Sequence, residues 1–287
     1  MGLFTNSKKT CPICNSPTPR FFAAFIEGMP ICKECSRKVD LPDGMLSTMT
    51  LADFRLYMDF YNENKRLRDV FTERLRLVPG YAADNLLLDT DNGLFRLKDE
   101  ETSLVFESSN LVSFHILEDN TPIFESVGDV LKCHKTDIPE HIRSLSALIT
   151  QIAMQQQINE QMEQEKQKER DIELPIPLKS FYVELAIDHP YWKGFRGELN
   201  GPRFKRDNPS VDEYLQEYRR SIGNLHKIAA SLMQMIHPGA REVYDGRALS
   251  VSETDPVGEI KRYKDLMDAG VITTEEFAAK KRQILGI

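Results

Sequence analysis

Two Cys-x-x-Cys pairs near the N-terminus constrain this sequence more than any other feature. They are Cys11-Pro-Ile-Cys14 and Cys32-Lys-Glu-Cys35, and 17 residues separate them. This spacing is typical of a zinc site with four thiolate ligands. Each pair directs two sulfurs toward one ion, and two pairs complete a tetrahedron with no open position. The sequence therefore predicts a structural Zn²⁺ ion held by Cys11, Cys14, Cys32 and Cys35.

Two disulfides, or two redox-active pairs, are the alternative interpretations of the same cysteines. The N-terminus Met-Gly-Leu-Phe-Thr-Asn-Ser lacks the apolar core of a secretory signal, so we expect a cytoplasmic chain. Disulfides are rare in that compartment. A module this small has too little core to fold alone, and zinc binding would contribute on the order of 10 kcal/mol. We expect Phe21, Phe22, Phe25 and Ile26 to pack around the metal.

The composition restricts the partners of the chain. Its 287 residues are 41% hydrophobic and 28% charged, which is typical of a water-soluble globular protein. No apolar run approaches the roughly 20 residues of a membrane-spanning helix. The net charge of -7 repels phosphate backbones and anionic membranes as a whole. Nucleic acid is therefore a possible partner but not the favoured one.

The residues outside the two pairs give little indication of catalysis. The fifth cysteine, Cys133, stands beside His134, and these two residues are the candidates for a nucleophile and a base if the chain is an enzyme. A part-buried, inert thiol is the more common role of such a cysteine. The sequence has no glycine-rich phosphate loop, Gly-x-Ser-x-Gly elbow or His-Glu-x-x-His helix. We therefore expect no enzymatic activity.

The rest of the chain has the pattern of a multidomain α+β protein. A helix is predicted from Thr50, its N-cap, to Phe71. Asp91-Asn92-Gly93 between two apolar runs predicts a β-hairpin. Ser210 and Glu213 form a capping box before an apolar stripe over residues 211–236, and Thr273 and Glu276 form a second capping box near the C-terminus. Several antiparallel strands closed by this helix indicate a sheet or barrel like that of pleckstrin-homology (PH) domains.

These signals divide the sequence into five predicted parts. A glutamine-rich helical insertion at 139–171 interrupts the PH-like part, and its polar end is either a projecting helix or disordered. The parts are a zinc ribbon at 1–45, a connecting helix at 46–76, the PH-like domain at 80–236, a linker at 237–256 and a helical hairpin at 257–287.

The C-terminal hairpin closely resembles a known domain. The run from Ile260 to Phe277 (IKRYKDLMDAGVITTEEF), together with Lys281 and Leu285, resembles the short C-terminal domain SHOCT. SHOCT domains end longer bacterial and phage proteins, and the resemblance implies a role in oligomerisation or interaction. We expect contacts with a protein partner or a second copy through the apolar residues Ile260, Leu266, Phe277 and Leu285.

A second resemblance covers most of the remaining chain. The two cysteine pairs after a Met-Gly-Leu-Phe start are similar to an uncharacterised bacterial zinc-ribbon family. Phe181-Tyr182-Val183 and Asp188-His189-Pro190-Tyr191-Trp192 are similar to a strand and turn of that family. The family implies an architecture and leaves the activity open.

Two functions follow as hypotheses. The first is a non-enzymatic, zinc-stabilised interaction or scaffold protein that self-associates through its hairpin. The alternative is a nucleic-acid-binding regulator that uses cations of the ribbon as phosphate contacts, namely Lys8, Lys9, Arg20, Lys33, Arg37 and Lys38.

Overall fold

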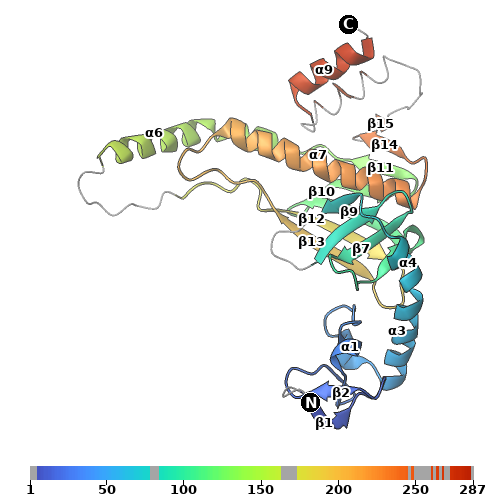
Figure 1. Cartoon of the computed structure of the whole chain (residues 1–287). Helices are drawn as coiled ribbons and strands as arrows, with labels where there is room; N and C mark the ends of the chain where they lie inside the picture. The colour runs from blue at the N-terminus through green and yellow to red at the C-terminus, as the bar shows by residue number, and fades with distance from the viewer. Residues whose placement is uncertain are drawn as a thin grey trace. The chain divides into compact units, whose positions relative to one another are not determined.

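The computed structural model describes residues 5–77, 84–162, 173–244, 247–248, 260, 263–264, 267 and 272–285. It is a mixed α+β structure with several sheets and a helix near the C-terminus (Figure 1). The chain divides into two compact units. Unit 1 contains residues 1–112 and 185–197, and unit 2 contains residues 113–184 and 198–287.

Unit 1 begins with two small hairpins. Strand β1 (Thr5–Thr10) pairs with β2 (Pro17–Pro19), and β3 (Phe25–Ile26) pairs with β4 (Met29–Pro30), both antiparallel. Gly28 has a φ of 75° in the turn between β3 and β4, a conformation that glycine adopts without a steric cost. The short helices α1 (Lys33–Ser36) and α2 (Met45–Thr48) follow.

The helix predicted from Thr50 to Phe71 is confirmed, in two pieces. Helix α3 (Leu51–Glu63) is continued by α4 (Lys65–Val70). The Thr50 hydroxyl accepts a hydrogen bond from the Asp53 N–H, and the Asp53 carboxylate accepts one from the Thr50 N–H, so Thr50 is the N-cap. The buried face of α3 carries Phe54, Tyr57, Met58 and Tyr61.

A four-stranded antiparallel sheet completes this part of unit 1. Its order is β5 (Leu75–Leu77), β6 (Asp84–Asp89), β7 (Leu94–Lys98) and β8 (Val105–Glu107). The hairpin predicted at 91–93 joins β6 to β7 and is confirmed. Gly93 has a φ of 63°, and the Asp89 carboxylate accepts hydrogen bonds from the main-chain and side-chain amides of Asn92.

A turn far along the chain, Asp188–Trp192, also belongs to unit 1. The His189 ring lies against the rings of Phe60, Phe106 and Tyr191, with centroids 4.9 to 5.9 Å away. Its Nδ1 accepts hydrogen bonds from the N–H groups of Tyr191 and Trp192, both at 3.2 Å. Aromatic packing and a side-chain acceptor together fix this turn.

The largest sheet has seven strands. Their order is β13 (Gly194–Asn200), β12 (Ser180–Ile187), β9 (Leu111–Glu118), β10 (Thr121–Val127), β11 (Val130–Cys133), β14 (Arg241–Tyr244) and β15 (Arg247–Ala248). A short 3₁₀ turn, η1 (Ser108–Asn110), precedes β9. The described strands β13 and β15 stand at opposite ends of this order, so the described strands do not form a closed barrel.

Helix α7 (Val211–Ile236) covers part of that sheet, as Figure 1 shows. It packs on β10 and β11 and against helix α5 (Ile138–Ser144). Ser210 is its N-cap, and the Ser210 hydroxyl accepts a hydrogen bond from the Glu213 N–H. The predicted apolar stripe is buried along most of its length, with Tyr214, Leu215, Tyr218, Ile222, Leu225, Ile228, Leu232 and Met233 among the buried residues.

Two predicted segments have a different structure or reach beyond the described residues. The predicted linker at 237–256 contains β14 and β15, and β14 pairs in parallel with β11. The four residues of β14 include one arginine and one glutamate and have no clear strand pattern, so only the pairing with a distant strand reveals it. The predicted helical insertion contains α5 and α6 (Ser146–Met162), and its residues 163–171 lie outside the described ranges.

The C-terminal helix α9 (Thr274–Leu285) begins at the predicted capping box. The Thr273 N–H donates to Glu276 Oε2 at 2.7 Å, and the Glu276 N–H donates to Thr273 Oγ1 at 3.0 Å. The Lys280 ammonium lies 5.8 Å from the centre of the Tyr263 ring. Of the predicted partner contacts, Leu266 and the side chain of Leu285 lie outside the described residues.

Candidate metal centre

The four cysteines of the two Cys-x-x-Cys pairs lie together in unit 1. The Sγ atoms of Cys11, Cys14, Cys32 and Cys35 are all within 4.8 Å of one another. Cys14 Sγ is 3.4 Å from Cys32 Sγ and 3.6 Å from Cys35 Sγ. No other described group of histidine, cysteine and acidic residues gathers in this way.

Local hydrogen bonds shape the backbone turn at each Cys-x-x-Cys pair and so orient its two sulfurs. In the first pair, the Cys11 N–H donates to the Ser16 oxygen at 2.8 Å, and the Asn15 N–H donates to the Cys11 oxygen at 2.9 Å. Asn15 takes a φ of 59°, which asparagine tolerates better than most residues. In the second pair, Cys32 is the N-cap of α1, and its Sγ accepts a hydrogen bond from the Cys35 N–H at 3.4 Å.

This geometry fits a tetrahedral metal ion. Four sulfurs at about 2.3 Å from Zn²⁺ are about 3.8 Å from one another in a regular tetrahedron. The two Sγ separations given above are close to that value, and each of the four cysteines is a free thiol. The four cysteines can therefore hold a metal ion, and an all-sulfur donor set of this kind favours zinc or iron–sulfur chemistry over magnesium or calcium.

The cluster is mostly shielded from water. Cys11, Cys32 and Cys35 are buried, whereas Cys14 is exposed. A hydrogen bond with Ser16 lowers the pKa of the Cys14 thiol to about 6. Burial raises the pKa of the Cys32 and Cys35 thiols. Ser16 therefore shapes the site through its backbone and side chain, a role that no sequence pattern indicates.

The predicted packing of Phe21, Phe22, Phe25 and Ile26 around the metal is wrong for the three phenylalanines. Ile26 is buried, but Phe21, Phe22 and Phe25 have exposed fractions of 69%, 106% and 52%. Phe22 adopts a φ of 56°, a left-handed conformation within the bend before β3. Because β3 and β4 have only two residues each, the hairpin has too little inward surface for the larger rings.

At least two of the six cations predicted as phosphate contacts already interact with other side chains of the protein. Arg37 forms an ion pair with Glu34 at 3.1 Å, and the Lys38 ammonium donates to Asn62 Oδ1 at 3.3 Å. The side chain of Lys8 lies outside the described part of the chain.

The Cys133 and His134 side chains have separate surroundings. Cys133 is 1% exposed at the end of β11. His134 Nε2 lies 3.0 Å from Glu125 Oε1, which also pairs with Lys132 at 3.0 Å. Successive residues of an extended chain point to opposite faces of a sheet, so the side chains of Cys133 and His134 do not form one site.

None of the helices in the described ranges is both long and apolar enough to span a bilayer.

Comparisons with known proteins bear on the C-terminal segment of the chain. No curated protein and no solved structure matches the chain. The resemblance to a zinc-ribbon family therefore stays a prediction. The family model described as the short C-terminal domain, SHOCT, matches residues 259–285, and it identifies that segment alone.

Proposed function

We propose that this chain is a non-enzymatic interaction protein, stabilised by one structural Zn²⁺ ion on Cys11, Cys14, Cys32 and Cys35. In this proposal the N-terminal module is a zinc ribbon, and the sheet covered by α7 is a PH-like domain. A sheet in the order β13, β12, β9, β10 and β11, in which β9, β10 and β11 pair antiparallel, together with one long amphipathic helix supports the second assignment. Zinc-binding thiolates persist in a reducing compartment, so we place the chain in the cytoplasm.

The observation that carries the proposal is the exposed apolar surface of the N-terminal module. Phe21, Phe22 and Phe25 are more than half exposed, and Met29 on β4 is 37% exposed. Covering one such side chain contributes about 1.5–3 kcal/mol. Large apolar side chains gathered on one short segment are typical of a protein-binding surface, whereas phosphate contacts require cations.

The C-terminal hairpin supplies the second interaction element. Ile260, Tyr263, Met267 and Phe277 are partly buried among the described residues. Two short helices bury little surface by themselves, so their apolar side chains need a partner. We propose that the hairpin associates with a second copy of itself through Ile260, Leu266, Phe277 and Leu285.

Light scattering on the purified chain tests the self-association. The full chain should have a mass above that of a monomer, and a chain that ends at Ser250 should be a monomer. Phe277→Asp should also give a monomer, because it places a charge on the apolar face of α9. Glu275→Gln, a change at an exposed position two residues earlier in α9, is the matched control and should keep the larger mass. Equal monomeric masses for all four proteins would refute self-association.

The N-terminal surface needs its own test. Quantitative pull-down with the full chain should retain a specific set of proteins that Phe22→Ser loses. Val70→Ser is the control, because Val70 is 53% exposed on α4, outside the module. Equal retention by both variants would contradict a role of the exposed phenylalanines in partner binding.

A further inference from the structure

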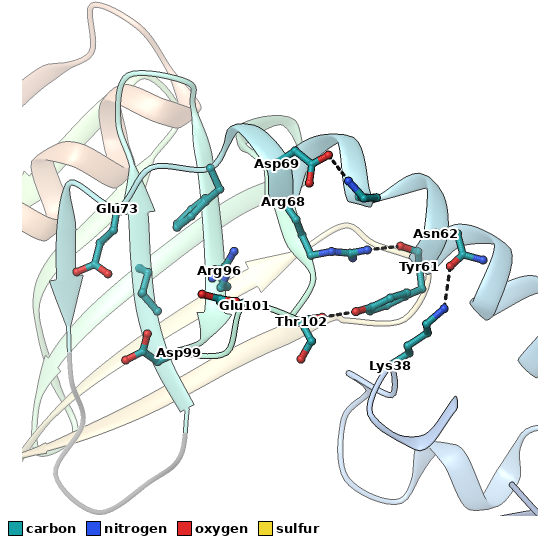
Figure 2. A pocket seen from close by; sticks show the side chains of 13 residues that line it. Lys38, Tyr61, Asn62, Arg68, Asp69, Glu73, Arg96, Asp99, Glu101 and Thr102 are labelled. Atoms are coloured by element: carbon teal, nitrogen blue, oxygen red, sulfur yellow. Dashed lines mark hydrogen bonds and ion pairs between the residues drawn. The ribbon is translucent and has the colours of Figure 1, made fainter. Parts of the chain in front are cut away.

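A pocket in unit 1 lies beside the four-stranded sheet. It has a volume of about 730 Å³, within the range of small-molecule sites. Its lining comes from Lys38, from α3, from α4 and the segment that follows it, from β6, and from β7 and the loop after β7 (Figure 2). In Figure 2, Arg96 lies between the side that bears Glu73 and Asp99 and the side that bears Arg68 and Tyr61. The pocket is separate from the cysteine cluster and from the SHOCT segment.

Arg96 on β7 is the least satisfied group of this pocket. It is only 8% exposed, and its Nε is buried without a hydrogen-bond partner among the described residues. Its guanidinium carbon lies 4.5 Å from the centre of the Phe71 ring, a cation–π contact that holds the group in place. Burial lowers the pKa of Arg96, although the negative charge of Asp99 opposes this effect. A buried N–H group without an acceptor is costly, which points to an acceptor that comes from outside the chain.

The other cations of the pocket are held in fixed positions. The Arg68 guanidinium lies 4.0 Å from the centre of the Tyr61 ring and donates to the Tyr61 oxygen at 2.8 Å and to Asn64 Oδ1 at 3.1 Å. Lys38 donates to Asn62 Oδ1 at 3.3 Å. These groups present positive charge to the pocket without having to rearrange first, which reduces the entropy lost on binding.

Most acidic residues of the pocket already have cationic partners. Lys65 pairs with Asp69, and Arg76 pairs with Glu73 and with Asp99. Glu101 is exposed in the loop after β7. With these carboxylates nearby, a ligand with two or more negative charges is repelled more strongly than one with a single charge.

We propose that this pocket binds the carboxylate of a small, singly charged organic acid through the Arg96 guanidinium. The planar guanidinium matches a carboxylate with two parallel hydrogen bonds. Phe71 and Leu87 supply an apolar wall for the hydrocarbon part of the acid. This site goes beyond the interaction role and does not depend on it.

Titration followed by NMR tests the site on the full chain. Benzoate is the probe, benzamide is its neutral control of the same shape, and inorganic phosphate is the multiply charged control. Benzoate should shift the Arg96 Nε–H and Leu87 methyl resonances in a saturable way at millimolar concentrations. Benzamide and phosphate should both bind at least about tenfold more weakly than benzoate. Benzamide has the shape of benzoate but no charge, whereas phosphate is charged but has neither the planar carboxylate nor the apolar ring.

Variants locate the interaction. Arg96→Lys keeps the charge but loses the planar fork, and it should weaken the benzoate effect on Leu87 by at least about tenfold. Arg66→Lys is the control, because Arg66 pairs with Glu107 and does not line the pocket. Equal shifts with benzoate and benzamide, no saturable shift, or an unchanged affinity in Arg96→Lys would each overturn the proposal. If Arg96→Lys does not fold, the benzoate and benzamide comparison on the natural chain decides the question.

Discussion

The Trp192 indole Nε1 donates a hydrogen bond to the main-chain oxygen of Asp40 at 3.0 Å, across 152 positions of the chain. Asp40 makes further contacts at the end of the cysteine module. Its N–H donates to the Tyr57 hydroxyl at 2.7 Å, and its Oδ2 accepts from the Leu104 N–H at 2.7 Å. Lys98 forms an ion pair with Asp40 Oδ1 at 3.1 Å. Asp40 therefore connects α3, β7, the start of β8 and the turn at 188–192 within unit 1.

Trp192→Phe should destabilise unit 1. The change leaves the buried Asp40 oxygen without its donor, which costs about 1–3 kcal/mol. Urea unfolding followed by circular dichroism measures the loss, since Trp192 is the only tryptophan and its fluorescence disappears in the variant. Phe22→Leu, at a fully exposed position, should change the stability by less than about 0.5 kcal/mol. A midpoint for Trp192→Phe equal to that of the natural chain would contradict this role of the hydrogen bond.

His189 should make unit 1 sensitive to acid. Burial lowers the pKa of His189 to about 4, and its Nδ1 accepts two backbone hydrogen bonds, so the ring is neutral in the fold. The unfolded chain takes up the proton near pH 6.5. The contribution of His189 is therefore complete above about pH 6.5 and is lost as the pH falls toward 4.

His189→Asn keeps a side-chain acceptor and removes the titration. Its stability should depend less on pH between about 6.5 and 4 than that of the natural chain. Unfolding free energies at several pH values measure this slope, and the His189 Cε1–H resonance reports the pKa directly. A titration of this resonance near pH 6.5 would refute the burial argument.

Glu118 should give unit 2 the opposite pH dependence. Its carboxyl is 4% exposed and accepts hydrogen bonds from the Tyr218 and Thr136 hydroxyls. Burial raises the pKa of Glu118 despite these two hydrogen bonds. The folded chain therefore keeps a proton that the unfolded chain releases, and stability declines as the pH rises above about 4.5.

Glu118→Gln should remove this decline, because the amide has the same shape and no charge. The variant should gain stability relative to the natural chain at pH 8 compared with pH 5. Urea midpoints at the two pH values measure the difference, and Glu275→Gln on the exposed first turn of α9 serves as the control. The same loss of stability at both pH values would show that Glu118 acts as an ionised acceptor instead.

Two glycines of unit 2 should respond to alanine in opposite directions. A Cβ on Gly201 would lie 2.6 Å from the Leu178 main-chain oxygen, so the backbone would have to move. In α7, a Cβ on Gly223 would meet no atom within 4 Å. Gly201→Ala should therefore lower the thermal midpoint. Gly223→Ala should raise the stability by about 0.5–1 kcal/mol, the helix propensity difference. A stabilising Gly201→Ala would disprove this close approach.

The sequence predicts best the features that depend on near neighbours. The capping interactions at Thr50 and Thr273 and the hairpin at Gly93 each involve residues within a few positions, and the structure confirms all three. The orientation of the two sulfurs within each cysteine pair follows from the same kind of local rule, because each pair forms its own turn. The meeting of the two pairs is predicted from their spacing of 17 residues.

The features that were missed depend on distant partners. The pairing of β14 with β11 joins segments about a hundred residues apart, so the pattern of residues 241–244 alone gives no sign of it. The exposure of Phe22 follows from its left-handed backbone, which composition does not reveal. Arg96 has the pattern of an ordinary strand residue, and only its burial beside Phe71 makes it a candidate ligand-binding residue.

Metal analysis by mass spectrometry tests the central claim most directly. The full chain, purified without added metal or chelator, should contain about one zinc per chain. Cys35→Ser should lose most of that zinc, and Cys133→Ser, the matched change at the cysteine outside the cluster, should retain it. The absence of stoichiometric zinc in the natural chain, or full retention of zinc in Cys35→Ser, would contradict a structural zinc site on the four cysteines.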